Sequence, residues 1–366
     1  MKGEKTLMAK KIGILTGGGD APGLNAVIRG IVVNGIRSGY EVIGFVDGWA
    51  GVLNANTTPL TLEDVEDIHR EGGTIIGTSR TPIFPKKEGQ KDRSDEAVAS
   101  LKKVGLHALI AIGGEDTLGE ANKLFKDGRF PNIVGVPKTI DNDLNATDYT
   151  FGFNTAVNIA MEALDRLHTT TRSHHRVMLI EIMGRHAGWI TLEAGMAGGA
   201  HMILIPEVNF DFNEICDVVK KRYESGKDYT IIAIAEGCEE ADSSKDKAVD
   251  AFGHVRLGGV AEEIEKRLED WLSKNLKKPY PEFKFEARSM VLGHLQRGGA
   301  PTAFDRVLGS RLGIEAIELV NNDKFGHMVS LQGTNILAVP LQEAVGTLKI
   351  VPPERYEEAR KFLGLI

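Results

Sequence analysis

The chain has 366 residues, enough for about two domains with a sizeable core. Its net charge of -7 argues against a general nucleic-acid binder, which usually carries an excess of basic residues. No run of roughly 18 apolar residues occurs, and the first residues lack the apolar core of a signal peptide. The two cysteines, Cys216 and Cys238, fit neither a zinc site nor a disulfide framework. We therefore expect a cytoplasmic protein with no nucleic-acid partner and no membrane partner.

Short β-branched runs alternate with helix-like segments along most of the chain. The runs are continuously apolar, which is typical of strands buried on both faces. The clearest helix is the amphipathic stretch 155–167. The alternation predicts an α/β fold with parallel sheets covered by helices. The predicted strands are 11–16, 41–45, 108–112, 133–136, 177–183, 202–205, 230–235 and 289–292.

Most predicted strands are followed by glycine and then by polar residues. Because ligands of parallel sheets bind beyond the carboxyl ends of strands, these turns should converge on one or two crevices. A domain boundary is expected near residues 150–154. The turns lie at 17–23, 77–80, 113–116, 183–189, 235–237 and 293–299.

Two of these glycine turns have the composition of an anion or metal site. In GGGDAPG (17–23), backbone amides before a helix can bind phosphate, although the sequence is neither common nucleotide motif. A plain strand-to-helix turn remains the alternative. In GGED (113–116), Glu115 and Asp116 suit Mg²⁺, which takes one or two carboxylates together with substrate phosphates. The alternative is that both residues favour a helix N-terminus.

The stretch VPKTIDNDL (136–144) carries a lysine, a hydroxyl and two carboxylates straight after an apolar strand. Phosphoryl transfer needs a base for the attacking hydroxyl and groups that neutralise and position the moving phosphoryl group. A carboxylate, Lys138 and Thr139 could fill these roles. An Asx turn next to a lysine is the structural alternative.

Basic side chains flank or end several of the apolar strands. Arginine is suited to bidentate contacts with phosphate, so the set indicates small anionic substrates. Ion pairing with the acidic surplus is the alternative for any single member. The set consists of Arg80, Arg172, Arg176, Arg185, Arg288, His294 and Arg297.

Taken together, these segments resemble the phosphofructokinase family, most closely its pyrophosphate-dependent or mixed-substrate group. They occur in family order from about residue 10 to about residue 310. The combination of TIDND, MGR and GHLQRGG is highly specific, whereas GGED alone would be weak. The matching segments are ILTGGGDAPGLNAVIRG, GGTIIGTSR, IGGEDT, PKTIDND, DYTFGFNTA, SHHRVMLIEIMGRHAGW, AEG and VLGHLQRGG.

The resemblance implies two Rossmann-like, three-layer α/β/α domains with mostly parallel sheets and an active site in the cleft between them. A domain of residues 1–152 plus about 296–345 would bind the phosphoryl donor, pyrophosphate or ATP. A domain of about 153–295 plus 346–366 would bind fructose 6-phosphate. The protein would be a homodimer or homotetramer whose active sites are completed across the subunit interface.

The implied reaction, in glycolysis, transfers a phosphoryl group to the 1-hydroxyl of fructose 6-phosphate, with Mg²⁺ as cofactor. By motif position, Asp141 would be the general base, with Thr139 and Asp143 beside it. Glu115 stands where the family usually has a metal-binding aspartate. Gly18 and Gly19 would contact the donor phosphate, and Arg80 and Arg185 would stabilise the transferred group. Met183, Gly184 and Glu236 would contact the sugar. His294 and Arg297 would hold the 6-phosphate, which Arg176 and Arg288 would reach from a neighbouring subunit.

The identity of the phosphoryl donor is inferred from Asp116 and Lys138, two positions at which similar ATP-dependent enzymes carry glycine. Asp116 would place a carboxylate where the α-phosphate of ATP lies, and like charges ~4 Å apart repel by roughly 4 kcal/mol at an effective dielectric of about 20. Pyrophosphate has no α-phosphate, and Lys138 could neutralise its added charge. Glu120 would crowd a ribose further. We therefore expect pyrophosphate as donor in a reversible reaction.

Three alternatives remain open. The first is an ATP-dependent phosphofructokinase of the same fold. The second is a lipid or NAD kinase, although those families lack the TIDND–MGR–HLQRGG series. The third is a non-catalytic sugar-phosphate sensor. Val33 stands where ADP-regulated relatives carry an arginine, so allosteric control by ADP is not expected.

Overall fold

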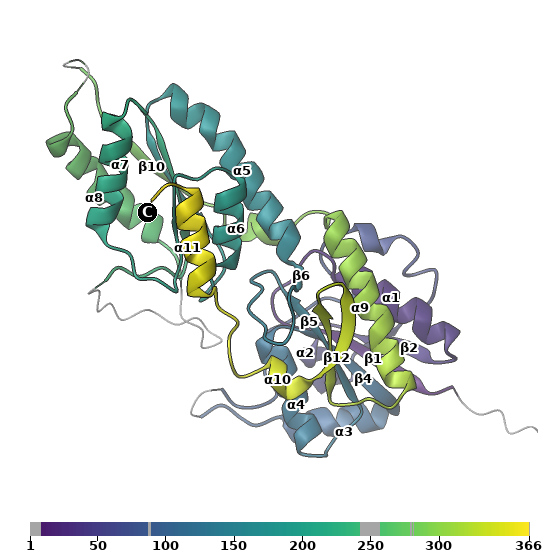
Figure 1. Ribbon diagram of the computed structural model, residues 1–366. Helices are drawn as coiled ribbons and strands as arrows, with labels where there is room; N and C mark the ends of the chain where they lie inside the picture. The colour runs from purple at the N-terminus through teal and green to yellow at the C-terminus, as the bar shows by residue number, and fades with distance from the viewer. Residues whose placement is uncertain (1–8, 87–88, 242–256, 279, 281, 366) are drawn as a thin grey trace, which may run out of the picture. The chain divides into compact units, whose positions relative to one another are not determined.

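The computed structural model describes residues 9–86, 89–241, 257–278, 280 and 282–365. The chain start, on which the expectation of no signal peptide rests, lies largely outside these ranges. The chain divides into two compact units (Figure 1). The first unit contains the described parts of Met1–Thr139, Leu144–Asn154 and Arg297–Leu348, and the second contains those of Ile140–Asp143, Thr155–Gln296 and Lys349–Ile366.

The sheet of the first unit is mostly parallel, in the order β12-β11-β5-β4-β1-β2-β3, with β6 paired to β5 off this path. Among the named strands of this sheet that the structure describes, only β2–β3 and β11–β12 pair antiparallel. The adjacent strands β5, β4 and β1 bring their carboxyl ends to one edge. The strands are β1 (Lys11–Thr16), β2 (Glu41–Phe45), β3 (Thr57–Pro59), β4 (Leu106–Gly113), β5 (Ile133–Thr139), β6 (Phe151–Gly152), β11 (His327–Gln332) and β12 (Asn335–Pro340).

Helices cover both faces of this sheet. One apolar cluster joins it to α1 (Leu24–Arg37) and α9 (Ala303–Asn321), which lie side by side (Figure 1). These helices approach closely, because a Cβ at Gly313 would lie 2.4 Å from the carbonyl oxygen of Val27. A second cluster packs the opposite face. Its helices are α2 (Trp49–Asn54), α3 (Ser94–Val104), α4 (Glu115–Lys126) and α10 (Leu341–Ala344), and a short 3₁₀ helix, η1 (Ile68–Arg70), lies against α1.

The sheet of the second unit is parallel throughout, in the order β10-β7-β9-β8. Helices α7 and α8 pack on one face around a buried apolar cluster. On the other face, α6 meets β9 and β8, and α11 packs on α6. The elements are α5 (Phe153–Ser173), β7 (Val177–Ile182), α6 (Trp189–Ala197), β8 (Met202–Leu204), α7 (Phe212–Glu224), β9 (Thr230–Ala235), α8 (Val260–Asn275), β10 (Ala287–Val291), η2 (Gly293–Arg297) and α11 (Pro353–Phe362).

The predicted α/β class, with mostly parallel sheets between helical layers, is confirmed. Every predicted strand is present, and three of them have the predicted bounds: β1, β2 and β9. The predicted helix 155–167 is part of the longer α5. The described helices are all too short or too polar to cross a bilayer.

Candidate active site

The glycine turn at residues 17–19 follows β1 and is tied to two neighbouring segments. The Gly17 N–H donates to the carbonyl of Ile112 at 3.0 Å, at the end of β4. The Gly18 N–H donates to the carbonyl of Ser79 at 2.9 Å, and the Thr78 hydroxyl donates to the Gly18 carbonyl at 2.8 Å. Gly18 has a φ of 83°, a left-handed conformation that favours glycine. The turn is therefore fixed beside Arg80, whose side chain is exposed.

Thr117, in the first turn of α4, fills the space between two glycines. A Cβ at Gly17 would lie 2.4 Å from Thr117 Oγ1, and a Cβ at Gly113 would lie 2.3 Å from Thr117 Cβ. Such separations are too short for real carbon atoms. Glycine at both positions therefore lets the turns after β1 and β4 approach the same buried hydroxyl.

Two cationic side chains lie on the glycine turn. Lys138, at the end of β5, is only 4% exposed, and its Nζ donates to the Gly19 carbonyl at 2.6 Å. The Nη1 of Arg297 donates to the Asp20 carbonyl at 3.2 Å, and a Cβ at Gly19 would lie 2.5 Å from it. The sequence analysis did not anticipate the contact of Arg297 with this turn. Two cations beside backbone amides form a suitable site for a phosphate group.

The two carboxylates of GGED open helix α4. Glu115 and Asp116 are both exposed in its first turn, where negative charge favours the helix dipole. Asp116 also forms an ion pair with Lys86, its Oδ1 lying 2.6 Å from the lysine Nζ. No sequence signal pointed to Lys86, because it lies in an irregular segment. Asp116 is therefore not an isolated negative charge, because the Lys86 ammonium partly neutralises it.

Glu120 lies on the same helix but is 5% exposed. Its Oε1 accepts the backbone N–H of Ile83 at 3.0 Å. Burial is the main cause that raises the pKa of this carboxyl to about 7. The expectation that Glu120 crowds a ribose is wrong, because its carboxylate is buried against the Ile83 backbone.

In the second unit, Glu236 follows β9 and organises the MGR turn that follows β7. Its Oε1 accepts the N–H of Arg185 at 3.0 Å and that of Gly184 at 3.4 Å. Arg185 has a φ of 54°, a left-handed conformation that is uncommon outside glycine. Burial raises the pKa of Glu236, the two backbone bonds oppose this, and the negative charge of Asp141 raises the pKa further.

Asp141 itself is 4% exposed and belongs to the second unit. The next residue, Asn142, has a left-handed φ of 52°, which asparagine tolerates well. The carbonyl of Asp143 accepts the N–H of Lys349 at 2.9 Å. The negative charge of Asp141 is one of the causes that raise the pKa of Glu236, after burial.

Gln296 is a site residue that sequence reasoning missed. It is fully buried, and its Oε1 accepts the backbone N–H of Met183 at 2.9 Å. The available signal was a glutamine between Leu295 and Arg297 inside the GHLQRGG segment. The nearby His294 is exposed.

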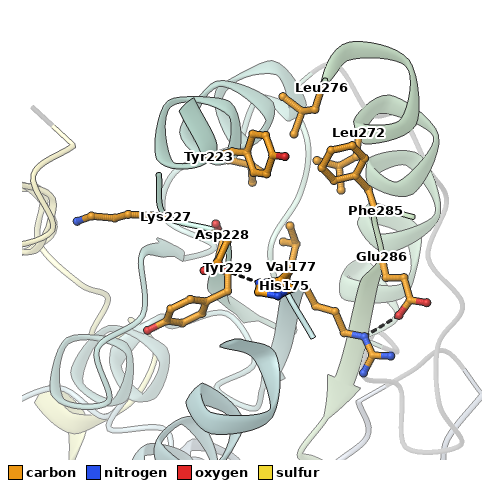
Figure 2. Close-up of a pocket in the computed structure, with 13 residues that line it drawn as sticks. His175, Val177, Tyr223, Lys227, Asp228, Tyr229, Leu272, Leu276, Phe285 and Glu286 are labelled. Carbon is orange, nitrogen blue, oxygen red and sulfur yellow. Dashed lines mark hydrogen bonds and ion pairs between the residues drawn. The ribbon is translucent and has the colours of Figure 1, made fainter. Parts of the chain in front are cut away.

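Arg176 and Arg288 share a carboxylate. Glu286 lies 2.6 Å from Arg176 Nε and 3.5 Å from Arg288 Nη2. Arg288 also contacts Glu269 at 2.7 Å. The pair at Glu286 is drawn as a dashed line in Figure 2, at the edge of a cavity of about 20 Å³. A cavity of this size holds about one water molecule, so it is not itself a substrate site.

The protein offers Mg²⁺ few ligands of its own. Within the described residues, no group of three or more histidine, cysteine or acidic side chains could hold a metal ion. Glu115 supplies one exposed carboxylate at the start of α4. This arrangement fits a hard cation held by one or two carboxylates and by substrate phosphates.

The fold and these clusters agree with the comparison of the chain with known families. Residues 11–320 match the family model described as Phosphofructokinase. The chain belongs to the phosphofructokinase family, and the predicted resemblance is confirmed at that level.

Individual relatives differ in their donors. The chain is 52% identical over 359 residues to the pyrophosphate--fructose 6-phosphate 1-phosphotransferase of Amycolatopsis methanolica, covering 97% of this chain and 100% of that protein. The enzyme of the same name from Dictyoglomus thermophilum is 48% identical over 362 residues, covering 97% and 99%. The ATP-dependent 6-phosphofructokinase 2 of Streptomyces coelicolor is 47% identical over 353 residues, covering 95% and 98%. Overall identity therefore does not decide the donor.

Solved structures agree on the fold. Phosphofructokinase from Pichia pastoris in the T-state has a TM-score of 0.78 at 30% identity, covering 92% of this chain and 35% of that chain. The present chain thus spans about a third of the yeast protein. Pyrophosphate-dependent phosphofructokinase from Marinobacter aquaeolei has a TM-score of 0.78 at 22% identity, covering 97% and 91%, and supports the fold alone.

Proposed function

We propose that this protein transfers a phosphoryl group from pyrophosphate to the 1-hydroxyl of fructose 6-phosphate, reversibly. The observation that carries the choice of donor is the buried Lys138 ammonium on the glycine turn, 2.6 Å from the Gly19 carbonyl. A diphosphate on that turn would meet Lys138 and the N–H of Gly19. The backbone of Gly18, whose own N–H donates to Ser79, would bound the same phosphates. Asp116 stands at the start of α4, where a nucleotide would extend beyond its two terminal phosphates.

Asp141 acts as general base in this proposal. Its carboxylate takes the proton of the sugar 1-hydroxyl, the oxygen attacks the terminal phosphorus, and the bridging P–O bond breaks to release phosphate. Thr139 and Asp143 stand beside it, and Arg80 and Arg185 stabilise the transferred group. Glu115, together with the diphosphate, would hold Mg²⁺, and the ion would supply neutralisation of phosphate charge. Chelation should abolish transfer, and added Mg²⁺ should restore it.

The sugar phosphate is assigned to the second unit, and the donor to the first. Met183, Gly184 and Glu236 would contact the sugar, because the MGR turn presents backbone and carboxylate groups together. His294 would hold the 6-phosphate. Arg297 is proposed for the same phosphate, and this contact requires its guanidinium to leave Asp20.

Arg176 and Arg288 would reach the 6-phosphate of a neighbouring subunit in a homodimer or homotetramer. Each already has a carboxylate partner in its own chain, so substrate would have to compete with Glu286. A monomer would then be inactive. Sedimentation of active and diluted enzyme tests this, and full activity in a monomer would contradict it.

The second candidate is ATP as donor, which the identity to ATP-dependent relatives favours. Purified protein should be assayed with fructose 6-phosphate and each donor, and in reverse with fructose 1,6-bisphosphate and phosphate. We expect turnover with pyrophosphate and formation of pyrophosphate in reverse. Efficient use of ATP with no pyrophosphate reaction would reject the proposed donor.

A further inference from the structure

The segment 83–86 lies along helix α4, and a buried hydrogen bond joins the two. The Ile83 side chain is fully buried, and its N–H reaches the buried Glu120 carboxylate at 3.0 Å. The Ile83 carbonyl accepts the Arg93 N–H at 2.8 Å. The backbone before Lys86 is therefore held on both sides.

Further along the segment, two side chains continue the contact with α4. Lys123 Nζ lies 5.1 Å from the centre of the Phe84 ring, a cation–π contact. Lys86 Nζ lies 2.6 Å from Asp116 Oδ1. Asp116, Glu120 and Lys123 are spaced i, i+4 and i+7, so they share one face of the helix. The segment thus delivers Lys86 to the first turn of α4.

The Lys86–Asp116 pair is partly exposed, with 28% and 47% of the side chains accessible. Exposed pairs of this kind contribute little to stability. Their effect on a charged ligand is larger, because an ammonium at 2.6 Å offsets the repulsion that Asp116 exerts on an approaching phosphate. Lys86 therefore lowers the negative charge that a long polyphosphate would encounter at the first turn of α4.

We propose that Lys86 is a specificity-determining residue that holds the Asp116 carboxylate and sets how strongly the site discriminates between inorganic pyrophosphate and nucleoside triphosphates. This inference rests on the proposed function, in which Asp116 faces the far end of the donor. Pyrophosphate ends before Asp116, whereas a triphosphate extends to it. Loss of Lys86 therefore affects the two donors unequally.

The test compares Lys86→Met with the wild type for each donor. Because Lys86→Met removes the ammonium that lies 2.6 Å from Asp116, kcat/KM for ATP should fall on the order of fivefold, and that for pyrophosphate less than about twofold. Lys86→Arg keeps the charge and should keep the donor ratio. Lys91→Met is the matched control, because Lys91 pairs with Glu96 at 2.5 Å instead of Asp116.

The outcomes separate this inference from the proposed function. An equal donor ratio in Lys86→Met and Lys91→Met would overturn the role of Lys86 while leaving the pyrophosphate reaction intact. If the wild type uses only ATP, the proposed donor fails, and a fall in ATP use confined to Lys86→Met still supports the ion pair. If Lys86→Met raises ATP use, Lys86 opposes triphosphates rather than neutralising Asp116, and the inference is wrong.

Discussion

The Lys138 ammonium donates to the carbonyl of Gly19 at 2.6 Å, joining the end of β5 to the turn after β1. A buried ammonium group beside a glycine turn that precedes a helix is well placed to contact an anion.

Lys138→Met should lower kcat/KM for pyrophosphate by about ten- to a hundredfold, because it removes a charge-assisted contact of roughly 1.5–3 kcal/mol. Steady-state kinetics with varied pyrophosphate measures the effect. Methionine keeps the length of the side chain, so the fold should survive. Unchanged pyrophosphate kinetics would show that Lys138 only supports the turn.

Asp141→Asn should lower kcat by about 10²–10⁴-fold while leaving the KM values nearly unchanged, because asparagine cannot accept the sugar proton. Asp165→Asn, an exposed change in the same unit, is the control and should retain full activity. Equal thermal midpoints for both variants would rule out unfolding as the cause. Turnover in Asp141→Asn equal to that of the control would remove Asp141 from the mechanism.

Glu120 makes stability depend on pH in a direction opposite to that of most carboxylates. Its pKa is raised from 4.5 to about 7 in the folded protein, chiefly by burial, with Asp116 opposing and Lys86 and Lys123 favouring ionisation. Since the folded state binds the proton more tightly than the unfolded chain, this contribution is present below about pH 4.5 and is lost as pH rises through about 7.

Glu120→Gln keeps an acceptor for Ile83 but cannot ionise. Relative to the wild type, it should gain roughly 3 kcal/mol of unfolding free energy between pH 4.5 and pH 8, at about 1.36 kcal/mol per pKa unit. Urea unfolding of both proteins at the two pH values measures the difference. A difference that does not change with pH would place the Glu120 pKa near its ordinary value.

Gly17→Ala should destabilise the first unit by about 1–3 kcal/mol, because the added Cβ overpacks against Thr117. Thr117→Ala removes the atoms at 2.4 and 2.8 Å, leaving the Thr117 Cβ at 3.2 Å. The double variant should therefore be more stable than the sum of the single changes implies. Strict additivity in urea unfolding would show that the two residues do not share this space.

Much of the fold could be predicted because its central strands are continuous apolar runs between glycine turns. β11 and β12 were not predicted. In β11 the buried Ser330 interrupts the apolar run, and its hydroxyl donates to the Ala146 carbonyl. β12 lies at the sheet edge with most of its residues partly or fully exposed. Edge strands and buried hydroxyls weaken the pattern that identifies a strand.

The candidate site was predictable where motifs directly follow strands. The parallel sheet brings Gly17, Gly113 and Lys138 to one edge, so their proximity follows from topology. The partners of those residues were not predictable. Lys86 reaches Asp116 only because segment 83–86 follows an irregular path fixed by a buried glutamate. Arg297 meets Asp20 across a separation in sequence that no local pattern encodes.

The last helix, α11, belongs to the second unit although the chain has just left the first. Trp189 donates to the Lys349 carbonyl at 3.0 Å, Glu207 accepts the Val351 N–H at 2.8 Å, and the Tyr356 hydroxyl donates to the Ile203 carbonyl at 2.9 Å. A premature stop after Leu348 would spare every residue assigned to the donor half. It would strip a supporting layer from the half assigned to the sugar. Loss of residues 349–366 should therefore impair sugar recognition before it affects donor binding.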